Sequence, residues 1–136
     1  MRCITLWQPW ATLIAIGAKQ FETRSWAVSF RDQLAIHAAK RPADARELNP
    51  AIVSALAGVG IVNLQQLTYG CVVCTVNLID CLRTEDAIAQ GLISDAERAF
   101  GDYRPGRFAW QLSDVQPVDN MPARGGQGLW HWQPPT

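Results

Sequence analysis

Residues 17–26 read GAKQFETRSW and follow directly on the apolar run WATLIAI at residues 10–16. Pro9 and Gly17 flank that run, which is typical of a short helix with proline near its first turn and glycine just past its end. Beyond Gly17 the residues alternate as in a strand, so side chains two positions apart share a face. The stretch therefore predicts a change from helix to strand, and the charged strand face carries Gln20, Glu22, Arg24 and Trp26.

Lys19, Glu22 and Arg24 can converge on one place, because Lys19 leads into the strand face on which the other two lie. Two cations beside one carboxylate hold it ionised, and such a group can fix an amide or the edge of a nucleobase. A plainer alternative is an exposed Glu22–Arg24 pair on a solvated face, with Lys19 complementing the negative end of the helix dipole. Spacing alone leaves both alternatives open.

The rest of the chain predicts a mixed α+β fold. Residues 42–58 and 85–100 favour helices. Asn49-Pro50 splits the first of them or starts a second turn, and the second is interrupted near Gly91. Because strands and helices do not alternate regularly, we expect a small β-barrel of five to six strands with peripheral short helices; a doubly wound parallel sheet is the alternative. The remaining strands are predicted at residues 3–6, 34–39, 70–82, 107–113 and 129–132, and the rest of the tail beyond residue 119 in loops.

The composition is that of a globular protein. The 136 residues are 49% hydrophobic and include six tryptophans, which supports one compact domain over residues 1–136. No apolar run is long enough to cross a membrane, and the N-terminus lacks a charged leader with an apolar region and a cleavage site. We therefore expect a soluble, cytoplasmic protein with no membrane partner, whose oligomeric state stays open.

Charge is unevenly distributed, although the formal net charge is zero. Residues 1–46 carry seven Lys and Arg against three Asp and Glu, which permits a basic patch in that part of the chain. Sequence-independent binding of duplex nucleic acid requires many neutralised phosphates, so we do not expect it here. A short single strand, a loop or one nucleotide requires less charge.

Cys71 and Cys74 have the spacing of half a zinc site. Their β-branched surroundings predict a strand, in which side chains three apart point to opposite faces, and His37 and His131 supply no second pair. The four cysteines are therefore expected to be reduced and packed as small hydrophobes. We expect no metal site and no cofactor, so any chemistry would be metal-independent or would use an ion held loosely by carboxylate and phosphate together.

The segment GAKQFETR fits the pattern G-x-K-x-x-E-x-R through Gly17, Lys19, Glu22 and Arg24, and in this the chain resembles ASCH domains (activating signal cointegrator homology). The likeness extends through the blocks LWQPWATLI, LAIHAAK, GCVVCTVNLIDC, FAWQLSDV and GQGLW. It implies a β-barrel of the PUA-like superfamily, whose members mostly bind RNA or modified nucleobases, with the motif lining a cleft beside the barrel. The first functional expectation is therefore a module that recognises single-stranded RNA or a modified nucleoside.

The resemblance also implies an enzymatic alternative, a metal-independent hydrolase in which Lys19 and Glu22 would be catalytic. One bacterial branch of the family removes acetyl from acetylcytidine, and another member is described as a ribonuclease. The first branch uses a lysine, a threonine three residues later and a distant glutamate. Lys19 matches that lysine, but Glu22 holds the threonine position and Thr23 is expected on the opposite strand face. Candidates for the distant carboxylate are Asp80, Glu85, Asp95 and Glu97.

Residues outside the motif extend the expected binding site. Trp7 and Trp10 flank Gln8-Pro9 and could stack on an unpaired base, although tryptophan is also a common core residue. The resemblance places this turn beside the cleft, which favours Trp10 for the face of the base and Gln8 for its edge. Further candidates for base or phosphate contacts, each with a structural alternative, are Trp26, His37 and Lys40.

Overall fold

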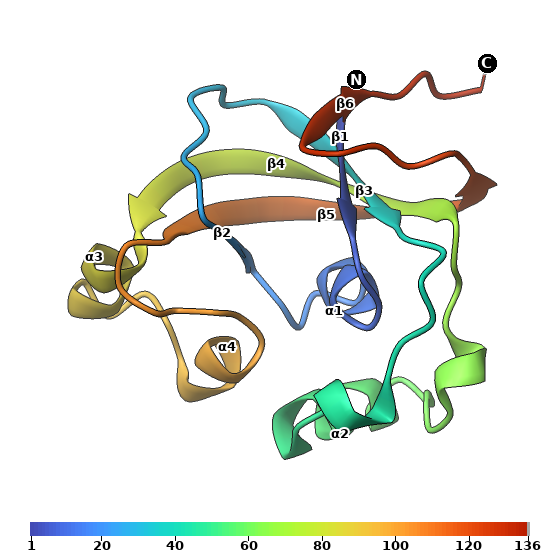
Figure 1. The fold of residues 1–136 in the computed structure, drawn as a ribbon, viewed down its shortest axis with the longest axis horizontal. Coiled ribbons are helices and arrows are strands. Elements are labelled where there is room, and N and C mark those ends of the chain that lie inside the picture. Colours follow the sequence, from blue (N-terminus) through green and yellow to red (C-terminus); the bar gives the residue numbers. More distant parts are fainter. Residues whose placement is uncertain (136) are drawn as a thin grey trace.

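Six strands pair into one curled sheet in the order β2-β5-β4-β3-β1-β6 (Figure 1). The structure is a computed structural model, and it describes residues 1–135. Within those residues only β1 and β3 run parallel, and every other neighbouring pair is antiparallel. The strands are β1 Arg2–Leu6, β2 Phe21–Arg24, β3 Gln33–Ala38, β4 Cys71–Arg83, β5 Phe108–Pro122 and β6 Leu129–His131.

The sheet curls into a half-barrel whose two edges are β2 and β6 (Figure 1). This confirms the α+β expectation of a small barrel-like sheet of five to six strands with peripheral short helices. A doubly wound sheet needs successive parallel strands joined through helices, and a single parallel pair does not supply them.

Short helices surround the sheet, and side chains fix where two of them begin. The Asn49 side chain accepts from the Ile52 backbone N–H at 3.0 Å, and the Ser94 hydroxyl accepts from the Glu97 N–H at 3.0 Å. Asn49-Pro50 thus starts a helix, and the expectation of helix from residue 42 onward was wrong: before Asn49 there is only a 3₁₀ turn, η1. The helical segments are α1 Trp10–Ala15, η1 Ala45–Glu47, α2 Pro50–Ala57, η2 Leu64–Gln66, α3 Thr84–Ala89 and α4 Asp95–Ala99.

Strand β5 is longer than its sequence predicts, because it continues through the polar segment that follows Ser113. Its first residues pair with β2 on one side, whereas beyond Gln111 only β4 accompanies it. The second half of β5 is therefore an edge, the place in a sheet where prolines such as Pro117 and Pro122 are tolerated. Pairing with the long strand β4 overrides a local sequence that favours a loop.

Helix α1 packs between the sheet and the other helices (Figure 1). Ala11 and Ile14 contact the core beneath the sheet, and Leu13 on the opposite side contacts the apolar cluster of α2. At the C-terminal end, the backbone N–H groups of residues 18 and 19 both donate to the Leu13 carbonyl, and Gly17 adopts a φ of 81°. This turn places Lys19 just before the first residue of β2.

The four cysteines are free, as the sequence predicts. The expectation that Cys71 and Cys74 face opposite ways was wrong, because a bulge in β4 shifts the register after Val72 and both side chains join the core beneath the sheet. Burial raises the pKa of the Cys74 thiol to about 12.

No helix among residues 1–135 is long and apolar enough to cross a bilayer.

Candidate functional site

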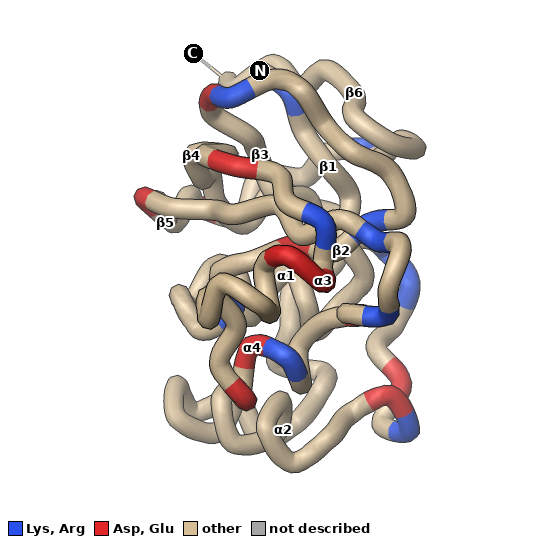
Figure 2. Tube along the Cα trace, turned by 90° about the vertical axis from the view of Figure 1, so that its left-hand side faces the viewer, with Lys and Arg blue, Asp and Glu red and all other residues tan. Residues whose placement is uncertain are grey.

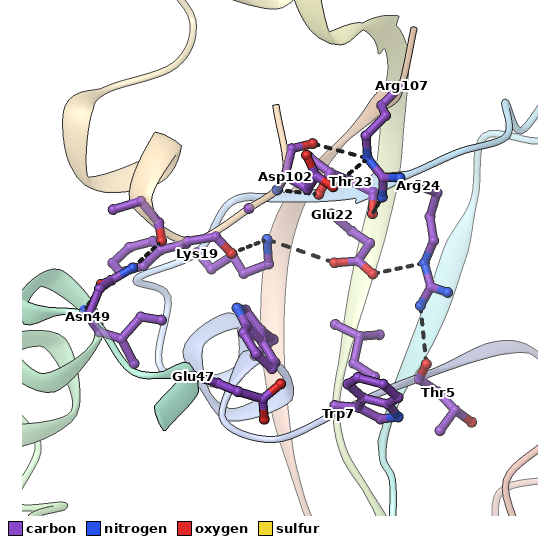
Figure 3. A pocket seen from close by; sticks show the side chains of 16 residues that line it. Thr5, Trp7, Lys19, Glu22, Thr23, Arg24, Glu47, Asn49, Asp102 and Arg107 are labelled. Carbon is purple, nitrogen blue, oxygen red and sulfur yellow. Dashed lines mark hydrogen bonds and ion pairs between the residues drawn. The ribbon is translucent and has the colours of Figure 1, made fainter. Parts of the chain in front are cut away.

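A cleft of about 620 Å³ opens beside β2 (Figure 3). Four segments distant in sequence line it: residues 5–10 at the turn from β1 to α1, residues 19–24, residues 47–52 and residues 99–107. Its volume lies within the range of small-molecule pockets, about 300–1,000 Å³. Figure 2 shows basic positions gathered along one side of the trace at the level of β2, with acidic positions directly below them.

Glu22 joins the charged residues of the motif into one row (Figure 3). Its Oε1 lies 3.8 Å from the Lys19 Nζ, and its Oε2 accepts from the Arg24 Nε at 2.9 Å. Arg24 also donates through Nη2 to the Thr5 carbonyl at 3.1 Å. The turn after α1 and the first residues of β2 therefore bring the three side chains together at one wall of the cleft. This is the first of the two alternatives that the sequence left open.

Lys19 is almost completely buried, with 1% of its surface exposed. Its Nζ donates to the Phe100 carbonyl at 3.3 Å. Burial lowers the pKa of the Lys19 ammonium, and the carboxylates of Glu22 and Glu97 oppose that shift. Lys19 is therefore easier to deprotonate than an exposed lysine, because the effect of burial is larger than the opposing effect of the Glu22 charge.

Glu97 of α4 lies behind Lys19 and is also buried. Its Oε1 accepts from the Gln20 backbone N–H at 2.7 Å, whereas its Oε2 has no hydrogen-bond partner among residues 1–135. Burial raises the pKa of the Glu97 carboxyl, and the bond from Gln20 and the charge of Lys19 oppose the shift. Of the four carboxylates proposed from sequence, Glu97 is the one that acts on Lys19.

Thr23 and Asp102 form the upper rim of the cleft (Figure 3), so the expectation that Thr23 lies away from Lys19 and Glu22 was wrong. The Thr23 hydroxyl accepts from the Asp102 backbone N–H at 3.0 Å, which ties β2 to the segment that follows α4. The Asp102 carboxylate accepts from Arg104 and also faces the Arg107 Nε at 3.4 Å. The Arg104 guanidinium chiefly lowers the pKa of Asp102 to about 2. The cations at this rim are therefore already paired with a carboxylate.

Gln8, favoured from sequence for the edge of a base, lies outside the cleft lining. It is fully buried, and its Nε2 donates to the Thr12 hydroxyl at 2.8 Å and to the Thr68 carbonyl at 2.7 Å. Its Oε1 accepts from the Thr12 backbone N–H at 2.9 Å. Both polar atoms of the Gln8 amide are thus used within the protein. Trp10, two residues further along the chain, does line the cleft.

Trp26, His37 and Lys40 also lie outside the lining. Trp26 packs edge-on against Trp110 with ring centroids 4.8 Å apart, and its carbonyl accepts from the Trp110 Nε1. His37 is buried between the Thr5 hydroxyl and the Ala123 carbonyl. Lys40 is exposed. The structure thus gathers Trp10, Lys19, Glu22 and Arg24 and leaves these three apart.

Several lining residues were not predicted from the sequence. Glu47, Asn49 and Asp102 sit in segments whose place beside β2 depends on how the helices fold back. A polar residue before Pro50 did signal a helix start, but no local pattern indicates what that start faces.

Among residues 1–135 no three His, Cys, Asp or Glu side chains gather closely enough to hold a metal ion.

Comparison with known proteins supports the fold and identifies the family. Over 83 residues, 59% of the chain, the sequence is 39% identical to activating signal cointegrator 1 of Homo sapiens and of Mus musculus; these residues make up 14% of either relative. The fold is similar to the crystal structure of ASCH from Zymomonas mobilis, with a TM-score of 0.56, 15% identity and coverage of 97% of this chain and 87% of that one. A Tyr-to-Phe variant of the Zymomonas protein gives a TM-score of 0.57 at 16% identity, covering 97% and 89%.

The ASCH domain pattern itself matches residues 4–120, which include every segment that lines the cleft. The chain therefore belongs to the ASCH domain family.

Proposed function

We propose that this chain binds single-stranded RNA or a modified nucleoside in the cleft beside β2. The observation that carries the proposal is the row of Lys19, Glu22 and Arg24 along one wall of a cleft large enough for a nucleoside. Glu22 offers carboxylate oxygens to an exocyclic amino group, and Arg24 offers guanidinium donors to a carbonyl or ring nitrogen. Membership of the ASCH family supports a nucleic-acid ligand.

The test compares Lys19→Ala/Arg24→Ala with the wild-type chain in binding to a labelled short single-stranded RNA and to acetylcytidine. The matched control is Arg31→Ala/Arg46→Ala, which removes the same charge from two cations that pair outside the cleft. We expect the cleft variant to lose binding and the control to keep it. Equal affinities in the two double variants would contradict binding through the cleft.

A second candidate function, metal-independent hydrolysis of an acylated cytidine or of RNA, is favoured by the surroundings of Lys19. Burial lowers the pKa of Lys19, which lines the cleft, and raises the pKa of the nearby buried Glu97, and these are the directions that suit a base and an acid. Incubation with acetylcytidine and short RNAs, followed by mass spectrometry, tests this function. Release of acetate or cleavage of RNA that disappears in Lys19→Met would support an enzyme. Intact substrates across pH 5–9 would leave the binding role.

A further inference from the structure

We propose that Trp7, braced by Arg41 and Glu47, is the platform on which an unpaired nucleobase stacks at the mouth of the cleft. The inference rests on the proposed function and deepens it, because it assigns the face of the base to a residue outside the G-x-K-x-x-E-x-R motif. The ligand feature is the unpaired base itself, supplied either by a free nucleoside or by a single strand.

Trp7 is the most exposed tryptophan, with 52% of its surface accessible. It follows β1 directly and lines the cleft close to the Lys19–Glu22–Arg24 row (Figure 3). The guanidinium carbon of Arg41 lies 3.9 Å from the centroid of its ring. Arg41 therefore covers one face of the indole, while about half of the residue's surface stays accessible and the residue lines the cleft.

Glu47 forms an ion pair with the Arg41 guanidinium. Its Oε1 lies 2.9 Å from the Arg41 Nη1, and the two side chains are each only about one third exposed, at 29% and 35%. Glu47 also lines the cleft, so the carboxylate that pairs with Arg41 and the ring of Trp7 belong to the same cavity. A tryptophan that packs against an ion-paired guanidinium has less freedom to lose when a base stacks on it, which reduces the entropic cost of stacking.

Packing within the protein does not account for the position of Trp7. The other exposed tryptophan, Trp26, packs edge-on against Trp110 and accepts its indole N–H through the backbone carbonyl. Trp7 has no aromatic neighbour of that kind, and its own indole N–H finds no acceptor among residues 1–135. Arg41 occupies one face of the ring, so a base would stack on the other face.

The charges around the cleft indicate what kind of ligand part it receives. Lys19 and Arg24 face Glu22, Arg107 faces Asp102, and Arg41 faces Glu47. Two cations share Glu22, but the residues that line the cleft balance in formal charge: the cations are Lys19, Arg24 and Arg107, and the carboxylates are Glu22, Glu47 and Asp102. An uncharged base fits this arrangement better than a run of phosphates, and its binding should depend only weakly on salt.

The experiment titrates cytidine, uridine, adenosine, guanosine, acetylcytidine and ribose 5-phosphate by calorimetry, and a labelled short single strand by fluorescence anisotropy. The proteins are wild type, Trp7→Ala, Trp7→Phe and the control Trp26→Phe, each with its melting temperature. We expect Trp7→Ala to weaken binding about 5- to 150-fold, the range for loss of one stacked base. Trp7→Phe and Trp26→Phe should keep most of the affinity, and ribose 5-phosphate should not bind.

The outcomes separate the two proposals. Loss of binding in Lys19→Ala/Arg24→Ala but not in Trp7→Ala would overturn the platform and leave the proposed function standing. Equal affinity of wild type and Trp7→Ala for every ligand, or tight binding of ribose 5-phosphate, would overturn the platform as well. Trp7-dependent binding of nucleosides identifies a free nucleoside as the source, and Trp7-dependent binding of the strand alone identifies single-stranded nucleic acid. Absence of binding by the wild-type chain would overturn both proposals.

Discussion

At the scale of single residues, the cleft depends on Glu22 as the shared acceptor of two cations. Lys19 is buried and Arg24 is half-buried, and both point to the same carboxylate. A buried charge that loses its partner costs much more than the pair contributed, because the remaining ion stays desolvated. The stability of this wall is therefore sensitive to Glu22 in particular.

We predict that Glu22→Gln lowers the free energy of unfolding by about 3 kcal/mol, because it leaves Lys19 buried without its carboxylate. Adding Lys19→Met should recover much of that loss, since the buried ion is then removed as well. Urea denaturation of the two single variants and the double variant measures the coupling. Strictly additive effects would show that the two side chains do not depend on each other.

At the scale of elements, Asn49 connects two helices beside the cleft. Its side chain accepts from the Ile52 N–H at 3.0 Å as the cap of α2, and its Nδ2 donates to the Ala99 carbonyl at 2.8 Å at the end of α4. The next residue after Ala99 supplies the carbonyl to which Lys19 donates. One amide therefore stabilises a helix start and also positions the acceptor of the buried lysine.

We predict that Asn49→Ala destabilises the fold by about 1–2 kcal/mol and also weakens ligand binding, because a cap and an inter-helix bond are lost together. Asn63→Ala is the matched control: Asn63 caps η2 through Gln65 and does not line the cleft. Thermal unfolding and nucleoside titration of both variants check this. A similar loss of affinity in Asn63→Ala would mean that general destabilisation, rather than the position of Phe100, explains the effect.

Local sequence patterns predicted the helix and the strand around the motif, but they did not predict which distant segments pack against these elements. The apolar run before Gly17 and the alternation after it predicted α1 and β2 because their signals lie within a few residues. The second half of β5 was missed because β4 imposes its pairing. Glu97 could be named only as one of four carboxylates, since its contact with the Gln20 N–H joins residues 77 positions apart in sequence.

At the scale of the whole molecule, His37 ties the C-terminal segment to the sheet. Its Nε2 faces the Ala123 carbonyl at 2.7 Å and therefore carries the proton, which leaves Nδ1 to accept from the Thr5 hydroxyl at 3.2 Å. The Trp130 Nε1 donates to that hydroxyl at 3.0 Å. Because the carbonyl of Thr5 also accepts from Arg24, the histidine network adjoins the cleft without lining it.

We predict that stability falls as the pH drops below about 6.5, and that part of this loss requires His37. Burial lowers the pKa of His37, so the folded state resists a proton that the unfolded chain accepts at its ordinary pKa of 6.5. The stabilisation is present above pH 6.5 and is lost as the pH falls through the folded pKa. Glu97, whose pKa is raised, contributes with the opposite sign.

Urea denaturation between pH 7 and pH 5 of wild type, His37→Gln and the exposed-site control His131→Gln isolates the effect. The acid-dependent loss should be smaller in His37→Gln and unchanged in His131→Gln. The same slope in all three proteins would show that His37 gains or loses no proton on folding in this range.

The central claim, that the cleft beside β2 receives an unpaired base, is tested most directly by an NMR titration of the ¹⁵N-labelled chain with acetylcytidine and with a short single-stranded RNA. We predict shifts of the Trp7 indole N–H and of the backbone amides of residues 19–24 and 99–102, with His131 and the α3 amides unmoved. Unchanged spectra, or shifts confined to a second groove between α2 and η2 that Pro42, Val53 and Leu64 help to line, would contradict it.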